Sequence, residues 1–148
     1  LHDALPISDQ LPAIFDRFEQ HVKEAEPLFI LEGRRLEEIA RVLPQHQRFY
    51  AHRAYEMKQV VKWLENYKFK LEARFTRNYQ QGQRALAPRE ATVFINGESA
   101  IIELNQFIIE ASLIYNYLNE IVDAFKQMAF MVSNMTKLRV AELQETIL

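Results

Sequence analysis

The sequence predicts an all-α protein in which a few long helices pack as an extended helical hairpin or bundle. Glycine and proline are scarce, with three and five residues in a chain of 148, so there are few positions at which a helix can end or turn. Neither occurs between Pro44 and Gly82 or after Gly97. Both stretches repeat apolar residues at steps of three and four, which is typical of helices with one buried face.

Composition bounds the possible classes of protein. Hydrophobic residues make up 49% and charged residues 26% of the chain, which excludes a wholly disordered protein and allows one domain with a real core. The absence of cysteine excludes disulfides, thiolate metal sites and a catalytic cysteine. No apolar run is long enough to cross a membrane, and we expect neither a spanning helix nor an ordinary export signal.

The first half of the chain should contain two short helical segments. We expect Leu1 to Ser8 to be foreign to the native protein, because they continue no pattern found later. From Asp9 to Val22 an amphipathic pattern predicts a short, loosely attached helix. The next segment has apolar residues on one face up to Leu43, and Pro44 should close it, because the residue before a proline is biased away from the α region.

The stretch between Pro44 and Gly82 predicts one long helix. At 1.5 Å per residue it would span roughly 55 Å, so it must pack against an equally long element. Its apolar stripe consists of Met57, Val60, Leu64, Tyr67, Leu71 and Phe75.

The last third predicts a short helix from Pro88 to Ile95 and then a long one. The long helix carries a heptad seam with a second apolar line beside it, and 25 of residues 99–140 are apolar. That is too many for a helix that covers one partner and exposes its back to water. Either the helix folds back at Ser133–Asn134 and buries itself, or it self-associates. We favour self-association, and the predicted oligomerisation residues are Leu104, Ile108, Tyr115, Leu118, Val122, Phe125 and Val132.

Cations are concentrated in the middle of the chain. Residues 1–44 hold five Lys/Arg against nine Asp/Glu and residues 91–148 hold three against seven, so each carries −4, whereas residues 45–90 hold ten against four and carry +6. Cations and aromatic rings on one helix face are typical of proteins that hold single-stranded nucleic acid, because cations neutralise phosphates and bases stack on rings. The alternative is a solvated helix surface on which Trp63 and Phe69 pack against another helix.

The sequence contains no catalytic constellation. The three glycines match neither phosphate-binding loop pattern, and the four histidines form no metal-binding motif. We expect His46 and His52 to be solvated. The predicted protein is therefore not an enzyme and needs no metal or cofactor.

Three sets of residues carry a family resemblance. The first set is Phe29-Ile30, which leads to Arg35-Leu36. The second is Leu71 to Phe75, with Tyr79 just before Gly82. The third begins at Thr92-Val93, passes through the residues Ala124 to Lys126 and ends with the run from Met135 to Arg139. Across Phe29 to Arg139 the chain resembles the UvsY family, the recombination mediator proteins of T4-like bacteriophages.

That resemblance implies an all-helical, non-enzymatic protein that forms a ring, a heptamer in the family, through its C-terminal region. It implies binding to single-stranded DNA, contacts with a phage recombinase and a single-strand DNA-binding protein, and a place in DNA recombination and repair in the cytoplasm of the infected bacterium. In that family a lysine lies two residues before an arginine in the long helix, and the pair contributes to DNA binding. In this chain Arg74 matches the arginine, but Glu72 occupies the position of the lysine. The predicted DNA-binding residues are Lys58, Lys62, Lys70, Arg74, Arg77 and Arg84.

These observations divide the chain into three consecutive regions. Residues 1–28 form an N-terminal tail and short helix, residues 29–90 a basic DNA-binding region, and residues 91–148 a C-terminal oligomerisation region. The rival hypothesis is a structural helical oligomer, such as a phage assembly chaperone or scaffold, whose basic face docks an acidic protein.

Overall fold

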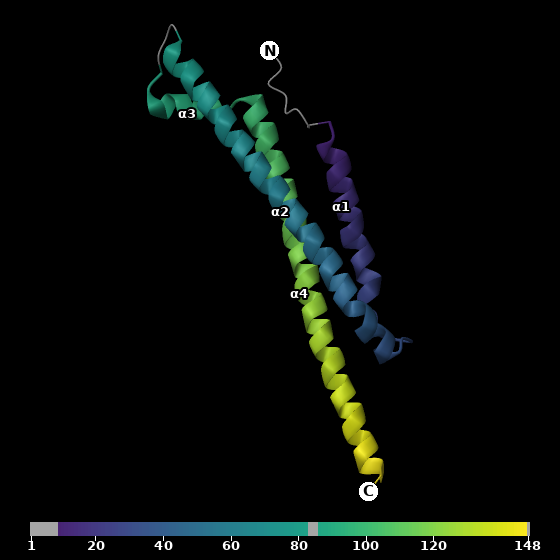
Figure 1. Ribbon diagram of the computed structural model, residues 1–148. Coiled ribbons are helices and arrows are strands. Elements are labelled where there is room, and N and C mark those ends of the chain that lie inside the picture. The colour runs from purple at the N-terminus through teal and green to yellow at the C-terminus, as the bar shows by residue number, and fades with distance from the viewer. Residues whose placement is uncertain (1–8, 83–85, 148) are drawn as a thin grey trace. The chain divides into compact units, whose positions relative to one another are not determined.

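The computed structural model describes residues 9–82 and 86–147, and this part of the chain is all-α, as the sequence predicts (Figure 1). In chain order it contains α1 (Leu11–Ala25), the 3-10 helix η1 (Glu26–Phe29), α2 (Leu36–Gln81), α3 (Pro88–Asn96) and α4 (Ser99–Ile147). The long helices α2 and α4 pack together, which confirms the expected helical hairpin. Leu1 to Ser8 and Arg84 lie outside the described residues.

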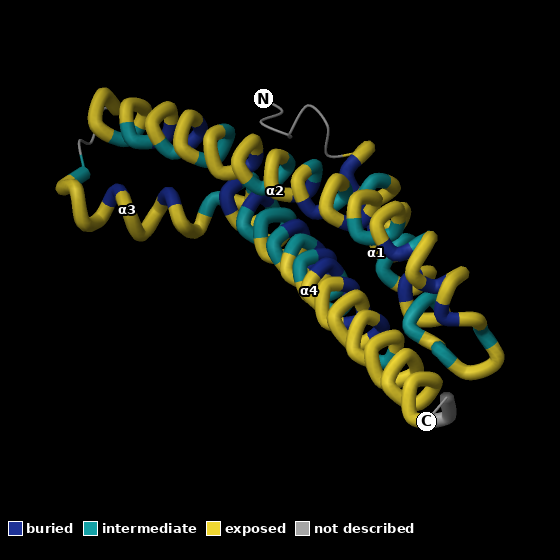
Figure 2. Tube along the Cα trace, turned by 60° about the horizontal axis from the view of Figure 1, so that its bottom comes forward, coloured by how far each residue is buried: buried dark blue, intermediate teal, exposed yellow. Residues whose placement is uncertain are grey.

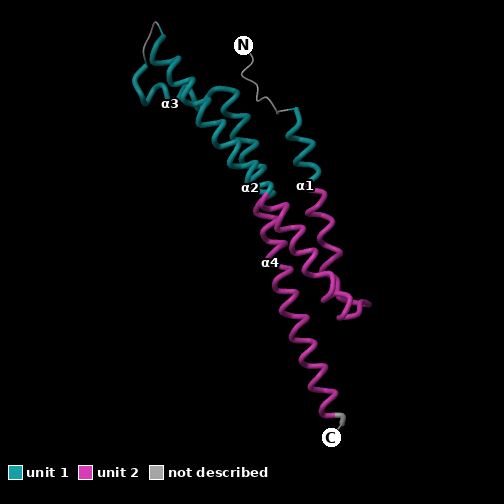
Figure 3. Tube along the Cα trace, in the orientation of Figure 1, with its two compact units in different colours: residues 1–17, 56–114 teal, residues 18–55, 115–148 magenta. Residues whose placement is uncertain are grey.

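The chain divides into two compact units, each built from segments that are distant in the sequence (Figure 3). Among the described residues, unit 1 comprises 9–17, 56–82 and 86–114, and unit 2 comprises 18–55 and 115–147. Helices α1, α2 and α4 each contribute a segment to both units. The units therefore differ from the three consecutive regions into which the sequence pattern divides the chain.

Pro44 lies inside α2, so the prediction that it separates two helices is wrong. The helix follows a turn in which Gly33 has a φ of +74°, a conformation that residues with a side chain rarely adopt. Within unit 2, burial continues across the proline from Leu43 to Tyr50. A proline inside a helix costs about 3 kcal/mol, and burying large apolar side chains on both sides of it offsets that cost.

Unit 1 has a core to which all four α-helices contribute buried residues. Its buried residues are Leu11 and Phe15 from α1, Met57, Leu64, Leu71 and Phe75 from α2, Ala91 and Ile95 from α3, and Ile101, Leu104, Ala111 and Ile114 from α4. Helix α3 lies against α2, where the Tyr79 ring is 6.0 Å from that of Phe94, and the Tyr79 hydroxyl donates to the carboxylate of Glu98, which lies between α3 and α4. The predicted short helix is thus present, with one further residue at its end.

Unit 2 has an aromatic core around Phe125 of α4. The Phe125 ring stacks with Phe29 at 4.5 Å, Tyr50 at 5.6 Å and His46 at 5.8 Å between centroids. The expectation that His46 is solvated is therefore wrong. Burial lowers the pKa of His46 below its usual value, and the nearby Arg34 cation lowers it further.

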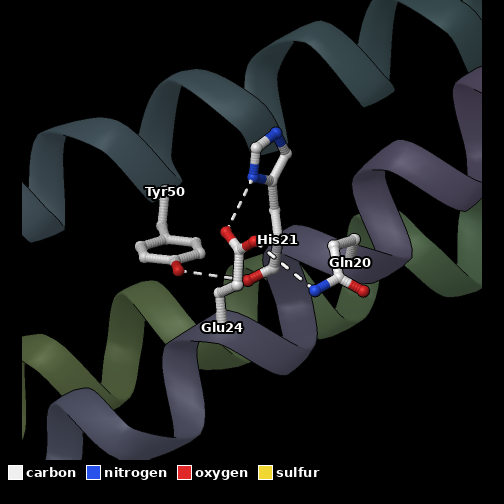
Figure 4. Close-up of polar contacts among 4 residues, drawn as sticks. All are labelled: Gln20, His21, Glu24 and Tyr50. Atoms are coloured by element: carbon white, nitrogen blue, oxygen red, sulfur yellow. Dashed lines mark hydrogen bonds and ion pairs between the residues drawn. The ribbon is translucent and has the colours of Figure 1, made fainter.

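Helix α1 is firmly attached, contrary to the expectation of a loose segment. In unit 2 the Tyr50 hydroxyl donates to the backbone carbonyl of His21 at 3.1 Å (Figure 4). Phe18 and Ala25 are buried in the same unit, and Leu11 and Phe15 are buried in unit 1. Four buried side chains from a helix of 15 residues give it a full apolar stripe.

Helix α4 does not fold back at Ser133–Asn134 but continues to Ile147. Its buried positions end at Val132, and the later part of the helix is mostly exposed (Figure 2). The alternative in which the helix buries its own surplus apolar face is therefore wrong.

Candidate nucleic-acid interface

The candidate interface is the solvent face of α2 in unit 1. Met57, Leu64 and Leu71 are buried on the opposite face against the rest of the unit. Because successive helical residues are rotated by about 100°, the positions on the far side of the helix from these residues point outward. The packing of the apolar stripe thus determines which side chains of α2 reach solvent.

Every described cation of the predicted DNA-binding set is exposed on this face. The set comprises Lys58, Lys62, Lys70, Arg74 and Arg77. At helical spacing these five side chains share an arc of roughly 160°, centred opposite the buried stripe. The structure thus brings the five residues onto one side of one helix; that they contact DNA remains a prediction.

The carboxylates of the same helix segment lie mainly to one side of this arc. Glu72 is half-buried and lies 3.6 Å from the Lys68 ammonium, so it neutralises a lysine outside the predicted set. Among the described residues, no carboxylate lies within ion-pair distance of Lys58, Lys62, Lys70 or Arg77. Most of the positive charge therefore remains available to an external anion.

Two aromatic side chains share this surface. Phe69 has 73% of its surface exposed, so most of its ring is open to solvent, although it borders a shallow cleft with Asn105 and Ile108 of α4. Trp63 is 40% exposed and stacks on Tyr67 of the same helix, with centroids 5.5 Å apart and an angle of 25° between the rings. Open ring faces beside cations are the arrangement on which unpaired bases stack.

Glu72, where the resemblance leads us to expect a lysine, does not lie among the cations of this face. Glu72 lies roughly 160° around the helix from Arg74, whereas Lys70 and Arg77 lie within about 60° of Arg74. The cations therefore gather on the Arg74 side, away from Glu72.

The predicted oligomerisation residues lie largely inside the chain's own units. Leu104, Leu118, Val122, Phe125 and Val132 are buried, and Ile108 and Tyr115 are half-buried. A surface that binds a second copy would need to use other faces of α4. The exposed large apolar residues of α4 are Ile102, Ile109 and Leu113 in unit 1, and Tyr117, Phe130, Met131, Leu138, Val140 and Leu143 in unit 2.

Sequence reasoning missed these outer residues because it followed the heptad seam, which is the strongest periodic signal. The surplus of apolar residues in α4 was the available signal, but periodicity alone does not tell which line the chain itself covers. Here most of the seam packs inside, together with Ile114 and Met128 beside it, whereas Ile109 and Phe130 are among the apolar residues that face solvent.

Two further properties of the described residues bear on possible chemistry. In the part of the chain that the structure describes, no three histidine or carboxylate side chains lie together in a way that could hold a metal ion. None of the described helices combines the length and apolar character needed to cross a membrane.

Comparisons of the chain with protein-family models, with curated proteins and with solved structures find no match.

Proposed function

We propose that this protein binds single-stranded DNA through the solvent face of α2 in unit 1 and acts as a recombination mediator without enzymatic activity. One observation carries the DNA-binding part: five cations share this exposed face, and no described carboxylate pairs with four of them. The mediator part is supported by the resemblance to the UvsY family. In this role the protein would help a phage recombinase replace a single-strand DNA-binding protein in the cytoplasm of an infected bacterium.

The surface matches the chemistry of a single strand. Ammonium and guanidinium groups neutralise phosphates whatever the sequence, and the release of bound counterions drives the association. The exposed ring of Phe69 adds a stacking platform, which is worth about 1–3 kcal/mol for each base engaged. This combination favours a single strand over a duplex, because only unpaired bases expose their faces.

A few phosphate contacts bind weakly in one copy of the chain, so the proposal includes self-association. The exposed apolar residues of α4 support it, since such residues form interfaces between subunits. A ring, a heptamer by resemblance, would repeat the basic face and raise affinity through effective concentration.

A second candidate function is a structural helical oligomer that docks an acidic protein. The exposed apolar residues of α4 favour protein–protein association in either role, so oligomer size does not separate the two. Binding to a nucleic acid does.

The decisive experiment measures the affinity of the full-length protein for a labelled oligothymidylate by fluorescence anisotropy over a series of salt concentrations. We expect log K to fall with log salt at about −0.7 for each neutralised phosphate. The charge-reversal variant Lys62→Glu/Lys70→Glu/Arg77→Glu should lose most of the affinity. A control with the same change in net charge, Lys126→Glu/Lys137→Glu/Arg139→Glu on α4, should lose much less.

Absence of oligonucleotide binding by the unmodified protein would refute the proposal and favour the structural role. Equal losses in the two variants would show a general charge effect instead of a site. Once DNA binding is established, the mediator role predicts faster recombinase assembly on DNA covered by single-strand DNA-binding protein. The α2 variant should lose that acceleration.

A further inference from the structure

A second basic surface lies on α2, in unit 2. Between Glu38 and Glu56 the helix has no carboxylate, yet these 17 residues contain three arginines and two histidines. Arg41, Arg48 and His52 are exposed. No carboxylate lies within the stretch itself; Glu37 and Glu38 lie one turn before Arg41, and Glu56 lies one turn after His52.

Part of this stretch forms a shallow cleft of about 420 Å³. The cleft is lined by Gln45, Arg48, Phe49, His52 and Arg53, which recur at steps of three and four and so share one side of the helix. Arg41 lies two turns before Arg48 on a neighbouring line, roughly 10 Å away along the helix axis. Guanidinium groups at such a spacing can each donate to a different phosphate of one strand.

The cleft is suited to a phosphate more than to a base. The Arg53 guanidinium lies 5.1 Å above the Phe49 ring, and two neighbouring rings, of His21 and Tyr50, approach the same phenylalanine at 5.2 and 5.1 Å. Phe49 therefore supports Arg53 and has little free face on which a base could stack. The polar groups of this cleft include the guanidinium of Arg48 and the amide N–H groups of Gln45, which can donate hydrogen bonds to an anion.

A carboxylate of α1 beside this aromatic cluster already has partners on its own helix. Glu24 lies 3.5 Å from His21 Nδ1 and accepts a hydrogen bond from Gln20 at 3.4 Å (Figure 4). In the described part of the chain, no carboxylate lies within ion-pair distance of Arg41, Arg48 or His52. These side chains thus keep their capacity to bind an external anion.

We propose that Arg41, Arg48 and His52 form a second contact site for the phosphodiester backbone of single-stranded nucleic acid. Tyr55, which is 63% exposed at the end of the same stretch, provides a ring on which a base stacks. The inference takes its ligand from the proposed function but does not require the residues of unit 1. Two basic surfaces on one chain would increase the number of phosphates neutralised per copy.

The test compares two double variants of the full-length protein that lose the same charge. Arg41→Gln/Arg48→Gln removes the proposed contacts, and Lys23→Gln/Lys126→Gln removes two exposed cations elsewhere in unit 2. We expect the arginine variant to lower the salt slope of oligothymidylate binding by about 1.4, and the control to leave it unchanged. Circular dichroism checks that both variants keep the helical content of the unmodified protein.

A second measurement locates the strand directly. Irradiation of the complex with an oligonucleotide containing 5-iodouracil should yield a cross-link at Tyr55. An unchanged salt slope in the arginine variant, with cross-links confined to unit 1, would overturn the inference and leave the proposed function intact. A loss in the arginine variant together with unchanged binding in the unit 1 charge-reversal variant would instead support the second site and refute the first.

The surface could alternatively bind an acidic protein. Binding of poly-glutamate that depends on Arg41 and Arg48, with no change in oligonucleotide binding, would assign it to such a partner and overturn the inference.

Discussion

Helices α2 and α4 are similar in length and in their buried faces but opposite in what they expose. They contain 46 and 49 residues, and each buries a line of large apolar side chains in both units. Helix α2 holds nine Lys/Arg against five Asp/Glu, or +4, whereas α4 holds three against six, or −3. The outer face of α2 is basic, with a few exposed aromatic rings, and that of α4 exposes many large apolar residues.

This difference shows that packing constrains only one side of each helix. The inner lines need apolar side chains of suitable size at steps of three and four, and both helices satisfy that requirement. The outer faces carry no such constraint, so their chemistry is informative about partners. A polyanion suits the face of α2, and an apolar protein surface suits that of α4.

The largest expected effect is a difference in stability between a substitution on the buried face of α4 and one on its exposed face. Phe125→Ala removes a fully buried ring that stacks with Phe29, Tyr50 and His46, and should lower the free energy of unfolding by about 3–5 kcal/mol. Phe130→Ala, at a position that is 70% exposed, should change it by less than about 0.5 kcal/mol. Chemical denaturation of both variants checks this, and equal effects would show that Phe130 is also buried in solution.

A smaller effect is a difference in DNA affinity between substitutions of unpaired cations and of a paired cation on α2. Lys70→Ala/Arg77→Ala removes two exposed cations with no described carboxylate partner, and should weaken oligothymidylate binding roughly tenfold at moderate salt. Lys68→Ala, whose ammonium already pairs with Glu72, should have little effect. Anisotropy titrations test the contrast, which fails if the Lys68 variant loses as much affinity as the double variant.

A still smaller effect concerns the tie between α2 and the start of α4 in unit 1. Tyr79→Phe removes the hydrogen bond to the Glu98 carboxylate, and should cost about 1 kcal/mol of unfolding free energy. That hydrogen bond, then burial and the charge of Glu98, raise the pKa of Tyr79 above its usual value. In Glu98→Gln one tyrosine should therefore ionise at lower pH in a spectrophotometric titration, and an unchanged titration would contradict the contact.

The smallest effect is a pH dependence of stability from His46. Its pKa is lowered in the folded state by burial and by Arg34, so the unfolded chain binds more protons between the folded-state pKa and the usual histidine value of 6.5. The contribution of His46 to stability is complete above its pKa in the unfolded chain and is lost as the pH falls through its pKa in the folded protein. His46→Gln should flatten the dependence of the denaturation midpoint on pH below neutrality. The other three histidines are present in both proteins and provide the common background.

Much of the fold could be predicted because helical spacing is a local property. The scarcity of glycine and proline and the steps of three and four predicted the two long helices and the short α3. The boundary at Pro44 could not be predicted, since the local preference against a proline inside a helix competes with burial of Leu43 and Tyr50 by distant segments. The same is true of His46, whose stacking partner Phe125 comes from a distant part of the chain.

The candidate site divides in the same way. The positions of Lys58, Lys62 and Lys70 on one face followed from their spacing, and the structure shows them exposed. The sequence could not predict that no described carboxylate pairs with these lysines, because ion pairing depends on side-chain positions that the spacing of residues along a helix does not define. The sequence marks the second basic stretch by its lack of Asp and Glu between residues 39 and 55. The net charge counted over a longer window did not distinguish this stretch from the rest of the helix.

By itself, the sequence determined the helical class, the apolar line along each long helix and the gathering of cations on α2, because these depend only on residue type and spacing along one helix. Only the tertiary structure decided that the seam of α4 is covered by the chain's own helices, while Phe130 and Leu138 remain exposed. The physical reason is that an apolar pattern records the capacity of a face to be buried, whereas burial itself depends on which other segments fold against it.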